Sequence, residues 1–215
     1  MKYRLIVFDW DGTIIDSAST IAECIRDASR DLGLEVPQLE RARHVIGLGL
    51  HDAMRLAVPD LPAQRYPEFV ASYRKHFLER KDAMRLFDGI RALLEELSKS
   101  HLLAIATGKS RAGLDRDLGF HNLQPLFATS RCADETNPKP HPAMLVEIMQ
   151  ELGVQNQTSL MIGDTSHDLE MARAAGVSAL AVTYGAHPES GLRACQPLGC
   201  FSTVTELKQW LSANG

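Results

Sequence analysis

The sequence of 215 residues lacks the features that mark several large protein classes. Its longest apolar stretches, such as Leu5–Phe8 and Leu102–Ala106, are far too short to span a bilayer, and its N-terminus has no signal-peptide layout. Charged residues of both signs are scattered along the chain, the net charge is −4, and no block of basic residues is present. We therefore expect neither a membrane nor a nucleic acid as a partner.

Cysteine is also sparse. The four cysteines, Cys24, Cys132, Cys195 and Cys200, stand far apart and form no CxxC pair. This spacing fits free thiols in a reducing compartment better than a disulfide framework or a zinc site, so we expect a cytoplasmic protein. Hydrophobic residues make up 45% of the chain and charged residues 23%, which is typical of a globular protein with a substantial core. A monomer or a small homo-oligomer is expected.

Short apolar runs alternate with amphipathic segments of helical length. The runs predict buried strands at residues 3–8, 102–107, 159–162 and 179–183, with a weaker one at 126–129. The amphipathic segments predict helices at residues 90–99, 111–118, 142–152 and 168–175. A capping-box pattern at Thr203 and Glu206 predicts a last helix over residues 204–211. This alternation predicts an α/β fold in which a Rossmann-like parallel sheet is covered by helices.

One long segment interrupts the alternation. Residues 15–83 show helical patterns and several prolines but no convincing strand. We therefore predict an α/β core formed by residues 1–14 and 84–215, with residues 15–83 inserted as an all-helical unit. The insertion follows the first strand, so its two ends must lie at the edge of the sheet where open α/β folds bind ligands. An insertion at that place would cover the site.

Acidic residues follow two of the predicted strands. Asp9 and Asp11 come directly after the first strand, and Gly12 allows the chain to turn sharply there. Asp164 follows the strand at residues 159–162, and Asp168 falls in the first turn of the next helix. Carboxylates placed in this way could hold a hard divalent cation. A solvated Asp-Gly turn and an ordinary helix-terminal acid are the alternatives.

Two further signals follow other strands or lie in the loops after them. Thr107 and Gly108 close the second strand, and a hydroxyl with free backbone N–H groups at a helix start forms an anion site. Helix capping would explain Thr107 or Ser110 equally well. Lys139 lies in the stretch NPKPHP, whose prolines stiffen the loop that presents it. A solvated surface lysine is the alternative. Together with the acids, these residues predict one shared site.

The segments DWDGT, TG, the lysine of NPKP and GDTSHD resemble, in order and approximate spacing, the four motifs of haloacid dehalogenase-like phosphohydrolases. The inserted helical unit resembles the α-helical cap of that family, and Phe87-Asp88-Gly89 is closest to its phosphoglycolate phosphatase-like branch. The resemblance implies a phosphoric monoester hydrolase that acts on a small phosphorylated metabolite, such as phosphoglycolate or a sugar phosphate.

The resemblance also implies a role for each motif residue. Asp9 would be the nucleophile that forms an aspartyl-phosphate, and Asp11 would be the general acid and base. Thr107 and Gly108 would bind phosphoryl oxygens, while Lys139 would balance the charge of Asp9 and the phosphate. Family members that cleave carbon–halogen bonds lack the second acid, so Asp11 argues for phosphoryl chemistry.

Magnesium is the cofactor that the resemblance implies. Mg²⁺ would be held by Asp9, the backbone carbonyl of Asp11 and Asp164, because few protein ligands plus waters suit this ion. Asp168 would not bind the ion directly but would hold the water ligands or Lys139 in place.

Substrate choice is expected to lie in the inserted unit. Arg43, His44 and Gly47 resemble the cap loop that approaches the active site in this family, although a turn with solvated basic residues would explain them as well. A sugar-phosphate mutase on the same core and a non-catalytic binding protein on a retained fold are the alternative functions.

Overall fold

Six parallel strands form the sheet at the centre of the molecule. The computed structural model describes residues 2–80 and 84–214. Within them the strand order is β3-β2-β1-β4-β5-β6, and every pairing is parallel. The strands are β1 (Leu5–Phe8), β2 (Leu102–Thr107), β3 (Thr129–Cys132), β4 (Ser159–Gly163), β5 (Ser178–Val182) and β6 (Cys200–Phe201). The chain order reverses direction on either side of β1, which places the topological switch point at this strand.

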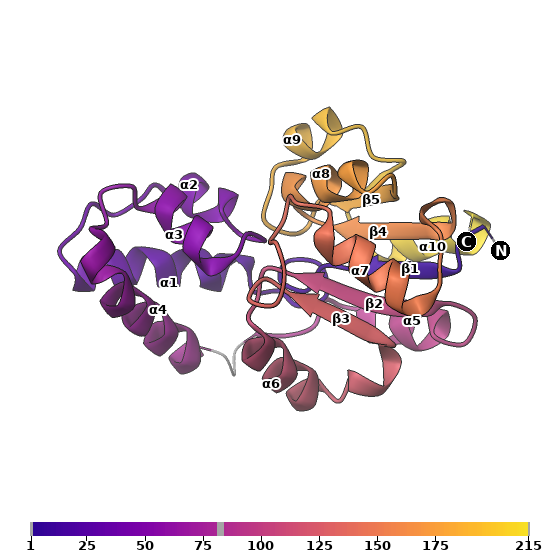
Figure 1. Cartoon of the computed structure of the whole chain (residues 1–215), viewed down its shortest axis with the longest axis horizontal. Coiled ribbons are helices and arrows are strands. Elements are labelled where there is room, and N and C mark those ends of the chain that lie inside the picture. The colour runs from indigo at the N-terminus through magenta and orange to yellow at the C-terminus, as the bar shows by residue number, and fades with distance from the viewer. Residues whose placement is uncertain (1, 81–83, 215) are drawn as a thin grey trace.

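Helices cover both faces of the sheet, as expected for parallel strands that are buried on both sides (Figure 1). Successive side chains of β1 alternate between two hydrophobic clusters. Ile6 packs in the cluster that includes α5 (Ile90–Leu97) and α10 (Val204–Asn214), and Leu5 packs in the one that includes α7 (Ala143–Leu152) and α8 (Ser166–Ala174). The predicted α/β class with a parallel sheet is confirmed.

The helices that directly follow β1 form a separate unit, which lies to one side of the sheet (Figure 1). They are α1 (Ala18–Asp31), α2 (Leu39–His44), α3 (Leu50–Ala57), the 3₁₀ turn η1 (Ala63–Arg65) and α4 (Tyr66–Arg80). The two chain segments that join them to the core run side by side, because Ile15 and Leu86 form an antiparallel bridge and Asp16 N donates to Arg85 O at 2.8 Å. The predicted boundary at Ala83 lies outside the described residues.

Most predicted elements match observed ones. The third strand begins at Thr129 and not at residue 126, because a 3₁₀ turn η3 (Gln124–Leu126) with Pro125 at its start occupies the preceding residues. The observed α6 (Arg111–His121) is longer than predicted. The short α9 (Glu189–Ala194) and the two-residue β6 carried no periodic signal and were not predicted. Among the described residues, no helix is both long enough and apolar enough to cross a bilayer.

Candidate active site

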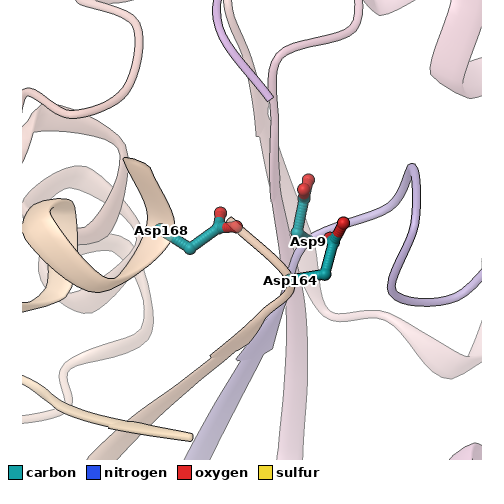
Figure 2. A group of neighbouring side chains, drawn as sticks. All are labelled: Asp9, Asp164 and Asp168. Carbon is teal, nitrogen blue, oxygen red and sulfur yellow. The ribbon is translucent and has the colours of Figure 1, made fainter. Parts of the chain in front are cut away.

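Three buried aspartates meet at the carboxyl ends of β1 and β4. Asp9 follows β1, Asp164 follows β4, and Asp168 reaches toward them from the first turn of α8 (Figure 2). One carboxylate oxygen of each lies within 4.8 Å of the others. The alternation of strand and motif in the sequence produces this convergence, because parallel strands all end at the same edge of the sheet.

The turn after Asp9 fits closely against Asp164. Gly12 has a φ of +83°, a left-handed conformation that favours glycine, and a Cβ atom at this residue would lie 2.2 Å from Oδ2 of Asp164. The Thr13 hydroxyl donates to Oδ1 of Asp164 at 2.7 Å, and the Ala186 N–H donates to Oδ2 at 2.7 Å. Thr13 therefore helps to position Asp164, a contact that the sequence analysis did not anticipate.

Lys139 is a buried residue with two carboxylate partners. Its Nζ lies 2.8 Å from Oδ1 of Asp9 and 2.6 Å from Oδ1 of Asp168, and the residue is 1% exposed. Asp168 also forms the capping box of α8, with its Oδ2 accepting from Thr165 N at 3.0 Å. Asp168 is thus both a helix-terminal acid and the partner of Lys139, so its two proposed roles do not exclude each other.

The charges of the three aspartates and Lys139 do not balance. Burial raises the pKa of Asp9, Lys139 opposes that shift, and the nearby Asp168 and Asp164 add to it. Burial and the charge of Asp168 raise the pKa of Asp164 to about 7. Burial alone would lower the pKa of Lys139, but Asp168 and Asp9 outweigh it and raise the pKa.

One ammonium therefore faces three carboxylates. Within the described part of the chain, Oδ2 of Asp9 is buried without any hydrogen-bond partner. An oxygen-rich cluster with surplus negative charge suits a divalent cation.

Asp11 is held by contacts that sequence reasoning missed. Its Oδ1 accepts from the Ser17 hydroxyl at 2.7 Å and from Nζ of Lys109 at 2.9 Å. Lys109 Nζ also lies 3.2 Å from Oδ2 of Asp117 in α6. Burial would lower the pKa of Lys109, but Asp11 and Asp117 outweigh it and raise the pKa. The position of Lys109 directly after the Thr107-Gly108 pair was the signal in the sequence.

Thr107 and Gly108 lie beneath the inserted helical unit. Thr107 is the last residue of β2, and its hydroxyl accepts from Lys109 N at 3.1 Å, whereas Ser110 is the N-cap of α6. A Cβ atom on Gly108 would lie 2.5 Å from the carbonyl oxygens of both Gly47 and Leu48. Only a glycine permits this approach of the loop between α2 and α3.

A cavity of about 310 Å³ lies between the helical unit and the core. Asp9, Asp11, Thr107 and Gly108 line it from the core side, and Gly47 lines it from the loop between α2 and α3. The cavity thus brings four predicted residues of the core motifs together with one of the three predicted cap residues.

The other two predicted cap residues, Arg43 and His44, lie outside the cavity lining. The Arg43 guanidinium donates to the carbonyl oxygens of Gly185 and Ala186, at 2.9 and 3.3 Å. The His44 carbonyl oxygen lies 2.9 Å from Nε2 of His167 and 3.0 Å from Nε2 of His187.

The rings of these three histidines pack together, with centroids 4.8 to 5.6 Å apart. Arg43 and His44 therefore join the helical unit to the core and do not line the cavity.

Known proteins share both the sequence pattern and this architecture. Residues 6–182 match the family model described as haloacid dehalogenase-like hydrolase. A Dickeya dadantii protein named "Probable phosphatase IndB" is 34% identical over 94% of this chain and 91% of its own length. The phosphoglycolate phosphatase of Aliivibrio fischeri is 29% identical over 90% of both chains.

The fold is shared with solved structures as well. A haloacid dehalogenase-like family hydrolase from Streptococcus pneumoniae superimposes with a TM-score of 0.83 at 26% identity, covering 98% of this chain and 99% of the other. The resemblance to the family and to its phosphoglycolate phosphatase-like branch is confirmed. The chain, with its aspartates at the sheet edge and its helical insertion above them, belongs to the haloacid dehalogenase-like hydrolase family.

Proposed function

We propose that this protein is a Mg²⁺-dependent phosphatase that hydrolyses a small phosphate monoester through an aspartyl-phosphate on Asp9. The observation that carries the proposal is Asp9 itself. Its Oδ1 is held by Trp10 N at 2.6 Å and by Lys139, while its Oδ2 has no hydrogen-bond partner among the described residues, and Asp9 lines the cavity. A carboxylate fixed on one oxygen and free on the other suits nucleophilic attack. The names of the relatives, which describe phosphatases, support the same class of reaction.

The reaction has two halves. In the first, a carboxylate oxygen of Asp9 attacks phosphorus, the bond to the leaving oxygen breaks, and Asp11 gives that oxygen a proton. In the second, Asp11 takes a proton from water, the water oxygen attacks phosphorus, and the bond to Asp9 breaks to release phosphate. Ser17 and Lys109 hold the Asp11 carboxylate at the cavity wall, where one group can serve both halves.

The remaining core residues would stabilise charge. The Thr107 hydroxyl and the Gly108 N–H would bind phosphoryl oxygens, and Lys139 would offset the charge of Asp9 and of the transferred group. Residues 15–83 would form the cap that covers this site and selects the substrate.

The acidic cluster fits a divalent metal because three buried carboxylates face one lysine. Asp9, Asp164 and the backbone carbonyl of Asp11 would hold Mg²⁺, and Asp168 would keep Lys139 in place. When bound, Mg²⁺ supplies positive charge that polarises the phosphoryl group and offsets the charge that builds up during transfer.

The direct test of this function is phosphate release from a panel of phosphate esters, assayed with Mg²⁺ and with a chelator. Release that requires the metal would support the proposal. No release from any ester in the presence of Mg²⁺ would contradict it and would favour a mutase or a binding protein.

Magnesium is expected to stabilise the fold, and more strongly at higher pH. The folded-state pKa of Asp164, about 7, lies above its ordinary value of 3.8, and that of Asp9 is also raised. These carboxylates therefore favour folding of the metal-free protein below about pH 4, and that contribution is lost as the pH rises through about 7. Mg²⁺ restores stability where the carboxylates are ionised.

Thermal unfolding checks this expectation. At 100 times the dissociation constant, Mg²⁺ adds about 2.7 kcal/mol, which corresponds to a rise in Tm of roughly 5 to 10 °C at about pH 8. The rise should be much smaller at about pH 5, because protons compete for the same oxygens. Asp164→Asn should abolish most of it. Equal rises at both pH values, or in the variant, would argue against this metal site.

Gly108→Ala tests how closely the cap loop must approach the core. The change keeps the backbone N–H but places a methyl group 2.5 Å from two backbone carbonyl oxygens, so the loop must move. We expect kcat/KM for phosphate release to fall by about tenfold or more, because displacement of the loop by about 1 Å disturbs the closed site. Gly119→Ala in α6, where a Cβ meets nothing within 4 Å, is the matched control and should keep wild-type kinetics. Unchanged kinetics in Gly108→Ala would contradict the expectation.

A further inference from the structure

The cavity above Asp9 has the size of a small phosphate ester. Its volume is about 310 Å³, and the share of one water molecule in the liquid is about 30 Å³, so roughly ten water-sized groups could fit. The volume therefore limits the substrate to a small ester, and the chemistry of the cavity wall decides which kind of leaving group it favours.

The cap side of the cavity is lined by apolar side chains. Ile21 and Ile25 of α1, Met54 of α3 and Phe77 of α4 are all buried residues that line it. These residues come from three separate helices, so the apolar wall surrounds the space above the reacting centre. Such a wall favours burial of an apolar group by roughly 25 cal/mol per Å² and offers nothing to the hydroxyls of a sugar.

Two of the three positive charges in the described lining are already matched. Lys109 pairs with Asp11 and Asp117, at 2.9 and 3.2 Å, and Arg116 pairs with Asp117 at 3.3 Å. Two cations therefore meet two carboxylates, and a substrate carboxylate would have to compete with them. Arg74 is the remaining cation of the described lining, and it is exposed to solvent, where water weakens its attraction.

The Tyr73 hydroxyl is a polar group of the cap wall that remains available. The Tyr73 hydroxyl has no hydrogen-bond partner among the residues that the structure describes, and Tyr73 lines the cavity. Burial, with a contribution from the charge of Asp11, raises the pKa of this phenol, so it remains a neutral donor. A donor in an apolar wall orients a ligand that carries a matching acceptor.

We propose that the leaving group of the substrate is an uncharged, mainly apolar body that fills this cavity and presents a hydrogen-bond acceptor to Tyr73. This substrate class excludes a carboxylate-bearing leaving group such as glycolate and an open polyhydroxyl sugar. The inference rests on the proposed phosphatase function, which it makes more specific.

A series of linear alkyl phosphates of increasing length tests the inference on the native protein with Mg²⁺. We expect kcat/KM to rise roughly fourfold per added methylene until the cavity is full, because each buried methylene is transferred from water to an apolar wall. An ester of equal length that ends in a carboxylate should be slower by about tenfold or more. A flat series, or a faster carboxylated ester, would overturn the inference.

A pair of variants on one helix sharpens the test. Leu50→Lys places a cation in the lining at a half-buried residue of α3, and it should reverse the preference toward the carboxylated ester. Leu56→Lys makes the same change on the same helix at an exposed residue outside the lining, and it should leave the preference unaltered. The same preference in both variants would overturn the inference, and the native series decides it if Leu50→Lys does not fold.

Binding of alkyl phosphonates, which cannot be hydrolysed, separates this inference from the proposed function. Calorimetry on the native protein with Mg²⁺ should show affinity that rises with chain length. Rising affinity without hydrolysis of any ester would support the apolar pocket while contradicting the phosphatase proposal. Affinity that is absent or independent of chain length would overturn the inference, whether or not esters are hydrolysed.

Discussion

Asp9→Asn is expected to reduce kcat for phosphate release by at least about 10⁴-fold, because an amide cannot form the phosphoryl-enzyme intermediate. The amide oxygen can still accept from Trp10 N and from Lys139, so the side chain keeps its position. The fold should remain intact. Burial raises the pKa of the native carboxyl, so replacing it with a neutral group removes an unfavourable buried charge from the metal-free protein. Circular dichroism and thermal unfolding check this second expectation.

Asp60→Asn provides the control for that variant. It makes the same chemical change at an exposed cap residue, and its kinetics should match those of the native protein. Substantial turnover by purified Asp9→Asn, above the level that trace contamination by native enzyme can supply, would show that another group is the nucleophile.

Asp11→Asn is expected to lower kcat by about 10² to 10⁴-fold, the usual contribution of a general acid and base. The effect on the first half-reaction should depend on the leaving group. An alkyl ester needs a proton on its departing oxygen, whereas nitrophenolate departs without one. With p-nitrophenyl phosphate the variant should therefore release one equivalent of nitrophenol rapidly and then stall, because the second half-reaction has lost its base.

Rapid-mixing measurements of nitrophenol release detect this burst. Its amplitude should equal the enzyme concentration, while the alkyl ester should show slow turnover without a burst. Asp117→Asn is the comparison variant, because Asp117 contacts Lys109 but does not line the cavity. Equal losses on both esters with no burst would contradict the dual role of Asp11.

The core of the site could be predicted from the sequence because each motif directly follows an apolar strand. Asp9 follows β1, Asp164 follows β4, and parallel pairing then places both at one edge of the sheet. This argument needs no knowledge of side-chain packing. Lys139 is different, because its loop alone does not reveal that the residue is buried between Asp9 and Asp168. The family resemblance supplied that expectation.

Several side-chain contacts could not be predicted in this way. The ion pair of Lys109 with Asp117 depends on which side of α6 faces Lys109. Asp117 is an acid at a buried helical position among apolar neighbours, so the sequence gives no sign of its partner. The placement of Arg43 depends on how the cap docks on the core. Its guanidinium reaches carbonyl oxygens of residues 185 and 186, which follow β5, and local sequence carries no signal of that contact.

The same limit applies to short elements. The two-residue β6 pairs with β5, but two residues are too few for hydrophobic periodicity to emerge. The start of β3 was shifted because the 3₁₀ turn at Pro125 competes with strand formation in the residues that precede it.

Transfer of the phosphoryl group to Asp9 is the central claim, and acid quenching of a reaction with a radiolabelled phosphate ester tests it most directly. Within one turnover, the native enzyme should carry label that hydroxylamine removes, as expected of an acyl phosphate, and peptide mapping should place it on Asp9. The label should decay as phosphate appears, and Asp9→Asn should carry none. Phosphate release with no labelled protein, or with label on a peptide that lacks Asp9, would contradict the account.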